Sequence, residues 1–361
     1  MTGPMQGRLL SPDALSADDR DCWTRLARDA VEPNPFFELE TVLPALEHLP
    51  HAGVSLLVVE EGGAWRACLP VQRTRVRGAR RALRSWLHAY AFLGTPLLDR
   101  HVAREAARAL LELGLDVAPG SRMQLEQVGW DGPAGAAIAQ AIEDLDVATV
   151  TQATAERAFL RRRPELTYMD DMRRKQRSEL DRKARRLEEA LGGELTTVEE
   201  GTDSDALDRF LELERAGWKG REDTALASSE SHAAFYRDAC RELAASGRLQ
   251  ILSLGTPDRK VAMMTNFAAA EGLFGFKMTH DEELARFSPG SLLLRESCRV
   301  FHERPELAWL DSCAAPGSAV ERLLPDRRSL ATLLLRPSGV GTSLELRALE
   351  AISRLRPDSR A

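Results

Sequence analysis

The stretch Phe276–Leu294 reads FKMTHDEELARFSPGSLLL and contains the end of an expected strand, a loop and the start of an expected helix. Ser288 can cap this helix, and Pro289 suits the first helical position. Gly290, Ser291 and Leu292 would then present free backbone N–H groups, where the helix dipole favours an anion. The stretch predicts either a phosphate-binding helix start or a well-capped helix without a ligand.

Three predicted strands lead into and through this stretch: Arg248–Gly255, Lys260–Glu271 and Gly272–His280. They are rich in apolar residues and are separated by short turns, which is typical of an antiparallel meander. The remaining elements of this half are a long charged helix (Tyr168–Leu191), a strand (Gly193–Glu200), two helices (Asp203–Gly217, Ser229–Ser246), a helix (Ser288–Arg304), a strand (Leu307–Cys313), a short helix (Ser318–Leu324) and a strand (Ser329–Arg336).

The N-terminal half repeats the order of strand, two helices, meander, helix, strand, helix and strand. The repeat lies in element order and not in residue identity, so two unrelated α+β domains remain the alternative. The expected elements are helices over Ala17–Val31 and Phe36–His48, a strand over Val54–Glu60, its hairpin partner over Ala64–Val76, an exposed basic connection over Arg73–Arg84, a strand over Trp86–Gly94, a helix over Val102–Leu113, a strand over Met123–Val128, a helix over Gly135–Glu143 and a strand over Val147–Thr151.

Length and composition indicate a two-domain globular protein. The chain has 361 residues, of which 43% are hydrophobic and 29% charged. The net charge of −6 argues against a general nucleic-acid binder. No run of about 18 apolar residues predicts a membrane span, and the N-terminus has no signal-like pattern. Five scattered cysteines favour a reducing compartment, so we expect a cytoplasmic protein without a metal site.

Two further stretches, FLELERAGWKGREDTAL (Phe210–Leu226) and WLDSCAAPGSAVERLLPDRRSLATLLL (Trp309–Leu335), sharpen the interpretation. Together with Phe276–Leu294 they resemble the C-terminal GNAT domain of the CelD-like, or BioF-like, acetyltransferases, which are related to the Fem aminoacyltransferases. PFFELE at Pro35–Glu40 resembles the first domain of that family. The resemblance implies an α/β (α+β) fold of two tandem GNAT-like domains, each a mixed, mostly antiparallel sheet flanked by helices.

The resemblance also implies a division of the chain. We expect a GNAT-like domain over 1–155, a connecting segment with a long charged helix over 156–192, a donor-binding GNAT domain over 193–340 and a helical tail over 341–361. The implied activity is acyl transfer from acyl-CoA, with acetyl-CoA as the leading donor, to an amine of a small-molecule, sugar or amino-acid-like acceptor. The alternatives are Fem-like transfer from aminoacyl-tRNA and a catalytically silent binding scaffold. The oligomeric state stays open.

The donor site is expected at Arg286, Ser288, Gly290, Ser291 and Leu292. GNAT enzymes that use acetyl-CoA usually carry an Arg/Gln-x-x-Gly-x-Gly/Ala loop here. This chain has Arg-Phe-Ser-Pro-Gly-Ser instead, which resembles the CelD-like pattern and keeps the aminoacyl-tRNA alternative open. Arg286 could contact a phosphate or could be a solvated loop arginine.

Acyl transfer to an amine requires a group that accepts a proton. Asp311, at the end of an expected buried strand, is the first candidate, and His280, at the end of a neighbouring strand, is the second. Splayed parallel strands would bring the two near one another. Asp311 could instead bond loop N–H groups or pair with Arg327 or Arg328. Cys313 is a weaker candidate for covalent chemistry or for protonating the leaving thiolate, because the helix expected near the last strands lacks a tyrosine.

Three residues are expected on the acceptor side. Trp218 and Lys219 follow a helix end in the family-like stretch and could close over a ligand, with simple packing as the alternative. Strand alternation would put Lys277 on the face opposite Phe276 and Met278, either in a cleft or exposed to solvent. The basic run Arg173–Arg186 predicts a salt-bridged helical face or, alternatively, a polyphosphate or tRNA contact.

Overall fold

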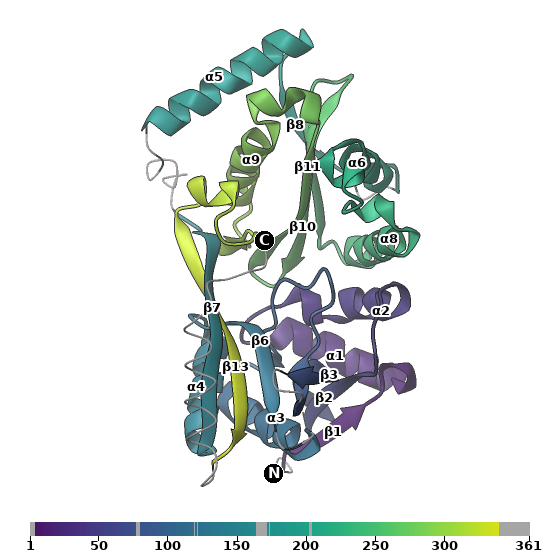
Figure 1. Ribbon diagram of the computed structural model, residues 1–361, viewed down its shortest axis with the longest axis vertical. Coiled ribbons are helices and arrows are strands. Elements are labelled where there is room, and N and C mark those ends of the chain that lie inside the picture. The colour runs from purple at the N-terminus through teal and green to yellow at the C-terminus, as the bar shows by residue number, and fades with distance from the viewer. Residues whose placement is uncertain are drawn as a thin grey trace. The chain divides into compact units, whose positions relative to one another are not determined.

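The computed structural model describes residues 4–76, 80–118, 120, 122–163, 172, 174–201 and 204–338. They form two compact units (Figure 1). Within the described residues, the first unit covers 4–43, 50–156 and 328–338, and the second covers 44–49 and 157–327. The helical tail expected over 341–361 and residues 168–171 of the expected long helix lie outside the described residues.

The first unit has a sheet in the order β1-β2-β3-β4-β6-β13, with β5 paired to β3. Neighbouring strands are antiparallel except β4 and β6, which are parallel. Helices α1 and α3 pack on its central strands. The elements of the first half of the sequence are β1 (Gln6–Leu10), α1 (Ala17–Asp29), α2 (Leu39–His48), β2 (Val54–Glu61), β3 (Ala64–Val76), β4 (Arg80–Ser85), β5 (Leu97–Leu98), α3 (Ala103–Val117), β6 (Met123–Gly129), α4 (Pro133–Asp144) and β7 (Val147–Arg161).

The second unit has a sheet in the order β7-β12-β11-β10-β9-β8, antiparallel except for the parallel pair β11 and β12. Helices α6 and α8 lie on one face of β10 and β11, and α9 and α5 lie on the other (Figure 1). The elements of the second half of the sequence are α5 (Arg174–Leu191), β8 (Thr196–Glu200), α6 (Ser204–Ala216), α7 (Trp218–Arg221), α8 (Glu230–Ala245), β9 (Leu249–Gly255), β10 (Lys260–Ala269), β11 (Gly272–His280), the 3-10 helix η5 (Glu282–Phe287), α9 (Pro289–Glu303), β12 (Trp309–Asp311), η6 (Ala319–Arg322) and β13 (Asp326–Pro337).

The two halves share the order strand, two helices, three-stranded meander, helix, strand, helical segment and strand. This confirms the predicted tandem of mixed, mostly antiparallel sheets flanked by helices. In the first half the opening strand is β1, which the sequence analysis did not single out.

The last strand of each half completes the sheet of the other unit. Phe159–Arg161 of β7 pairs with Trp309–Asp311 of β12 in the second unit. Leu330–Leu335 of β13 pairs with Met123–Gly129 of β6 in the first unit. The compact units are therefore not contiguous in sequence. The expected domains 1–155, 156–192, 193–340 and 341–361 remain a proposal about the division of roles.

Two expectations for the first half were wrong. Trp86–Gly94 is not a strand, and the described residues of Arg73–Arg84 belong to strands and not to a connection, because β3 runs to Val76 and β4 starts at Arg80. Strand β4 is held by pairing with β3 and β6, and these long-range bonds outweigh its basic composition. The apolar segment after it is buried without regular structure.

Candidate functional site

The start of helix α9 has the predicted position but not the predicted bonds. Pro289 occupies the first turn, as expected. Ser288 has a left-handed backbone with φ 54°, and its side chain does not cap the helix. The N–H groups of Ser291 and Leu292 both donate to the Ser288 carbonyl, at 3.0 and 3.2 Å. The expectation that these two N–H groups are free was therefore wrong, and among the described residues only the Gly290 N–H of the three lacks such a bond.

Helix α5 brings a lysine to this helix start. Lys183 Nζ donates to Ser288 Oγ at 2.8 Å and lies 3.3 Å from Glu179 Oε1. The second contact is an i,i+4 pair predicted from the sequence. The cation and the N-terminal end of the α9 dipole thus meet at Ser288, and both favour an anion there.

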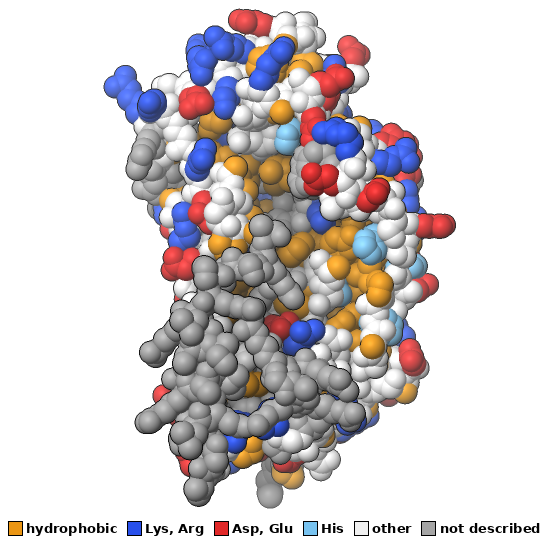
Figure 2. Space-filling view, viewed as in Figure 1, with side chains coloured by type: hydrophobic (Ala, Val, Ile, Leu, Met, Phe, Trp, Pro, Cys, Tyr) orange, Lys and Arg blue, Asp and Glu red, His pale blue; other side chains and the backbone are white. Residues whose placement is uncertain are grey.

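A basic pocket of about 530 Å³ lies beside this point. Four of its lining residues are cationic and one is anionic, which leaves a formal excess of three positive charges. Lys and Arg side chains gather over α5 in Figure 2. The guanidinium of Arg286 also lies 4.7 Å from the ring centroid of Phe287. The lining residues are Arg182, Lys183, Arg186, Glu189, Ala190, Arg286 and Phe287.

Helix α5 is fixed against α9 by an apolar stripe. Leu180 and Leu187 are buried, and Ala184 and Leu191 pack against the same hydrophobic cluster, in the i, i+4, i+7, i+11 pattern of an amphipathic helix. Asp181 adds a bond to Arg295 of α9 at 2.9 Å. The sequence favoured a salt-bridged face for this helix, with a polyphosphate or tRNA contact as the alternative. The packing of the helix against α9 was not predicted, although its four apolar residues were a readable signal.

The end of strand β11 lies next to the same helix start. An ideal Cβ placed on Gly290 would lie 3.5 Å from Nδ1 of His280 and 3.6 Å from the terminal methyl of Met278. His280 is therefore close to the proposed phosphate site. Residue Asp281, which follows it, caps η5 by accepting from the N–H of Glu283.

Strand β11 contains an irregularity that changes which way its side chains face. The pairing with β10 shifts between Thr265 and Asn266, opposite Lys277 and Gly275, so Phe276 is an extra residue. Phe276 stacks on Phe267 with ring centroids 4.2 Å apart and on Tyr236 of α8, whereas Met278 packs with the α9 cluster. The expectation that Phe276 and Met278 share a face was wrong because of this bulge. Lys277 is half-buried.

Asp311 is fully buried and already paired. Its Oδ2 accepts from Arg157 at 2.5 Å, and its Oδ1 accepts from the N–H of Cys313 at 3.0 Å. A loop N–H bond was one predicted alternative, but the arginine is Arg157 and not Arg327 or Arg328. Both carboxylate oxygens are therefore already bonded inside the protein. The contacts argue against the base assignment, which stays a prediction.

Asp311 and His280 do not lie together. Asp311 pairs with Phe274, near the beginning of β11, while His280 ends that strand. His280 lies six positions further along the strand than Phe274, a distance of about 20 Å, so the expected proximity was wrong. The strands pair over only three residues because β12 ends at Asp311, where the chain turns through a positive φ of 51° at Cys313.

Cys313 is poorly suited to nucleophilic chemistry. Burial raises the pKa of its thiol well above the usual value, and the nearby Asp311 carboxylate raises it further. The thiolate is the reactive form, so this environment suppresses its reactivity.

The backbone of Trp218 and Lys219 forms the first residues of the short helix α7. Their side chains lie outside the described part of the chain, so their expected contact with an acceptor is untested. Arg221 in the same helix forms an ion pair with Glu282 at the start of η5. This pair puts α7 next to the connection between β11 and α9.

The first unit has a different connection at the corresponding position. Residues 86–102 link β4 to α3, and much of this connection is buried. The side chain of Asn34 donates to the carbonyl oxygens of Leu93 and Thr95, at 3.1 and 2.8 Å. The N–H of Gly94 bonds Gln127, and a Cβ on Gly94 would lie 1.9 Å from the Glu126 carbonyl oxygen. In the first unit, the buried backbone of residues 86–102 therefore occupies the position that corresponds to the connection before α9.

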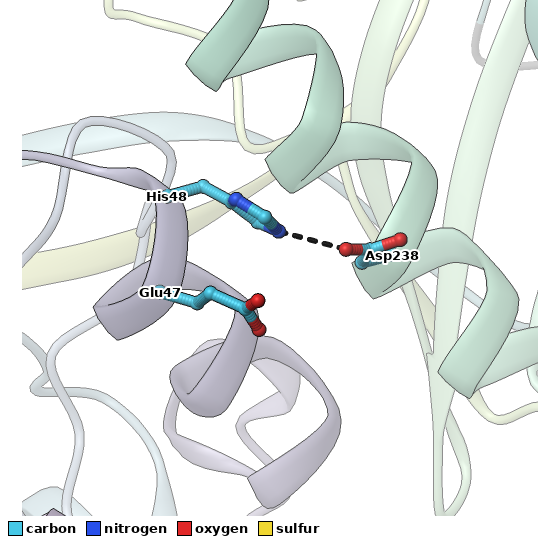
Figure 3. Close-up of side chains that lie close together, drawn as sticks. All are labelled: Glu47, His48 and Asp238. Carbon is cyan, nitrogen blue, oxygen red and sulfur yellow. Dashed lines mark hydrogen bonds and ion pairs between the residues drawn. The ribbon is translucent and has the colours of Figure 1, made fainter.

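One group of potential metal ligands was found in the described residues: Glu47, His48 and Asp238 (Figure 3). Nε2 of His48 lies 2.7 Å from Oδ2 of Asp238. Arg241 donates to the other oxygen of Asp238, also at 2.7 Å. Because the carboxylate already has a cation and a histidine as partners, we assign no metal to this group.

Comparisons with known proteins identify one domain and the fold of the chain. Residues 174–317 match a family described as an acetyltransferase (GNAT) domain, and this region begins with α5. A comparison with curated protein sequences found no match.

Solved structures share the fold at low sequence identity. FemX has a TM-score of 0.60 at 9% identity, over 95% of this chain and 100% of that chain. The C-terminal domain of a putative lysylphosphatidylglycerol synthetase from Agrobacterium fabrum has a TM-score of 0.55 at 13% identity, over 92% and 95%. A conserved protein of unknown function from Bacteroides thetaiotaomicron has a TM-score of 0.53 at 13% identity, over 90% and 98%.

The fold and the matched domain define an acyltransferase of the GNAT type. Residues 174–317 match the GNAT domain family, and the chain as a whole shares its fold with FemX and with the C-terminal domain of a putative lysylphosphatidylglycerol synthetase. Across the described ranges, no helix combines the length and the apolar character needed to cross a bilayer.

Proposed function

We propose that this protein transfers an acyl group from an acyl-CoA, with acetyl-CoA as the leading candidate, to an amine of a small-molecule, sugar or amino-acid-like acceptor. The proposal rests on one observation: a basic pocket lies beside Ser288, at the start of α9, and Lys183 lines the pocket and bonds Ser288. Its volume of about 530 Å³ falls within the range of about 300–1,000 Å³ that is usual for small-molecule sites. A phosphate-bearing donor fits this combination of shape and charge.

Each residue of the donor site has a distinct proposed task. The N–H of Gly290 and the cations Lys183 and Arg286 bind phosphate oxygens. Ser288 holds Lys183 in place and closes the first helical turn by accepting from Ser291 and Leu292. We therefore propose that Ser291 and Leu292 shape the site and do not donate to the donor directly.

The chemistry requires few protein groups. The acceptor nitrogen attacks the thioester carbonyl, the carbon–sulfur bond breaks, an amide forms and the CoA thiol leaves. The nitrogen must lose a proton, and the thiolate must gain one or leave unaided. His280 remains the candidate base, although its place beside Gly290 also suits a role in orienting the phosphates. Lys277, Trp218 and Lys219 remain proposed acceptor-side residues.

The proposal extends to the division of roles and to the setting of the protein. The domain over 193–340 would bind the donor, and the domain over 1–155 would serve the acceptor. The family-like stretches support assignment to the CelD-like acetyltransferases. All five cysteines are free, which supports a reducing, cytoplasmic setting.

Transfer from aminoacyl-tRNA is the second candidate. The observations that favour it are the exposed arginines of α5 and the likeness of fold to FemX. The acidic net charge of −6 counts against a polynucleotide donor.

Thermal unfolding with CoA, acetyl-CoA and longer acyl-CoAs tests the proposal. A ligand that binds only the folded protein raises the melting temperature, and at 100 times Kd the stabilisation is about 2.7 kcal/mol. We expect this shift for the wild type and its loss in Gly290→Val, with Gly290→Ala as the smaller matched change. No shift with any thioester, together with a shift from aminoacyl-tRNA, would favour the second candidate. Shifts from neither would indicate a scaffold.

A further inference from the structure

Two of the four cationic residues that line the basic pocket, Arg182 and Arg186, have no role in the proposed phosphate site at the start of α9. Arg182 and Arg186 line the pocket from α5, are exposed, and form no ion pair within the residues that the structure describes. They are one helical turn apart, with a rise of about 6 Å between them, so both guanidinium groups can reach one bound group. Arg185 is exposed on the same helix but does not line the pocket.

Guanidinium groups suit a phosphate monoester in particular. Each offers a planar fork of N–H donors, and a terminal phosphate has three acceptor oxygens with a charge of about −1.5 to −2. The Ser288 end of the pocket, with Lys183 and the α9 dipole, already suits the diphosphate expected of the donor. Arg182 and Arg186, on the side of the pocket that α5 forms, therefore offer a second anion subsite, separate from the one at Ser288.

The helix backbone that carries this subsite is held in place. Leu180 and Leu187 are buried against the α9 cluster, and Asp181 is bonded to Arg295. The backbone of α5 is thus fixed before a ligand arrives, which lowers the entropic cost of binding.

We propose that Arg182 and Arg186 bind the 3′-phosphate of the CoA ribose, so that the protein selects CoA thioesters over dephospho-CoA thioesters. The inference rests on the proposed acyl-CoA donor and adds the group that sets donor specificity. Dephospho-CoA differs from CoA only by this monophosphate, so the pair of ligands isolates the subsite.

Isothermal titration calorimetry with CoA and with dephospho-CoA tests this inference without any acceptor. We expect the wild-type protein to bind CoA at least tenfold more tightly than dephospho-CoA, the size of one lost charge-assisted contact. Arg182→Ala/Arg186→Ala should remove this preference by weakening CoA binding alone. Arg185→Ala is the matched control and should keep the preference, and circular dichroism checks that each variant is folded.

The outcomes separate this inference from the proposed function. Equal affinity of the wild type for both ligands, or equal weakening of both in the double variant, would overturn the subsite and leave the acyl-CoA donor standing. Loss of the preference in Arg185→Ala would also overturn it, because general charge would then explain the effect. Absence of binding by either ligand would overturn the proposed donor itself, and binding of tRNA that depends on the same arginines would identify its replacement.

Discussion

The connections from β11 to α9 and from β4 to α3 occupy the same position in the two repeats but differ in chemistry. The first runs over 281–288, is rich in charge and ends at a helix start beside four cations. The second runs over 86–102 and is largely buried, with Asn34 bonding its backbone from within. Under the proposal that the start of α9 binds the donor, the two repeats share a fold, and the chemistry of the connection decides which of them accepts a ligand.

Strands β7 and β13, which each pair with a strand from the other half of the sequence, give a second comparison. Arg157 lies two residues before Phe159, which faces Asp311, and Arg328 lies two residues before Leu330, which faces Gly129. Both arginines are buried and paired, Arg157 with Asp311 and Arg328 with Glu32. An ideal Cβ at Gly129 would lie 2.6 Å from Arg328 Nη2. The two repeats therefore have a buried arginine at equivalent positions of their last strands. The carboxylates that pair with these arginines, Asp311 and Glu32, come from different parts of the fold.

The largest expected effect comes from removing one of these carboxylates. Asp311→Asn leaves the buried Arg157 without a counter-charge, and we expect unfolding free energy to fall by about 3–5 kcal/mol. Glu32→Gln should have an effect of similar size through Arg328. Urea denaturation measures both. If Asp311→Asn keeps wild-type stability and loses turnover, Asp311 is the catalytic base and the structural interpretation is wrong.

A second prediction contrasts the glycines of the two connections. Gly94→Ala places a methyl group 1.9 Å from the Glu126 carbonyl oxygen, and we expect a loss of about 3 kcal/mol from forced backbone movement. Gly290→Ala meets His280 and Met278 only at ordinary contact distances, and it should be about neutral. Thermal unfolding without ligand compares the variants. Equal destabilisation would show that the two connections are packed alike, and the contrast between them would then be wrong.

The third prediction concerns acid stability of the first unit. Burial lowers the pKa of His88 to about 3, from an ordinary value near 6.5. Below pH 6.5 the unfolded chain therefore binds a proton that the folded protein does not. Stability should fall by about 1.4 kcal/mol per pH unit between these values, or about 2 kcal/mol by pH 5.

Chemical denaturation at pH 7.5 and pH 5 measures this loss, and His88→Gln should reduce it by that amount. An unchanged pH dependence in the variant would show that His88 is not the group responsible.

Local pattern was sufficient for much of the second unit. Strand β11 has the predicted bounds Gly272–His280, and α9 starts at the predicted Pro289. Both follow from short-range signals, a turn before the strand and a proline after the loop. Apolar runs likewise predicted β2 and β3. The Trp86–Gly94 segment failed because the same apolar composition suits a buried irregular segment whose carbonyl groups bond the side chain of Asn34.

The candidate site was less predictable because it depends on long-range contacts. The bond of Lys183 to Ser288 joins residues that are 105 positions apart. The register of β11 and β12 separates His280 from Asp311, and the partner of Asp311 comes from β7 in the other half of the sequence. The positive φ of Cys313 and the bulge at Phe276 also change the direction in which neighbouring side chains point. No local pattern encodes these relations.

Hydrogen–deuterium exchange with and without acetyl-CoA tests whether the donor binds at the start of α9 and not at the connection from β4 to α3. It compares both connections in one experiment. We predict slower exchange in 280–292 and in 182–190 when the donor is bound, and unchanged exchange in 86–104. Protection of 86–104 alone, or no protection of 280–292 at a saturating donor concentration, would contradict the assignment of the donor site to the start of α9.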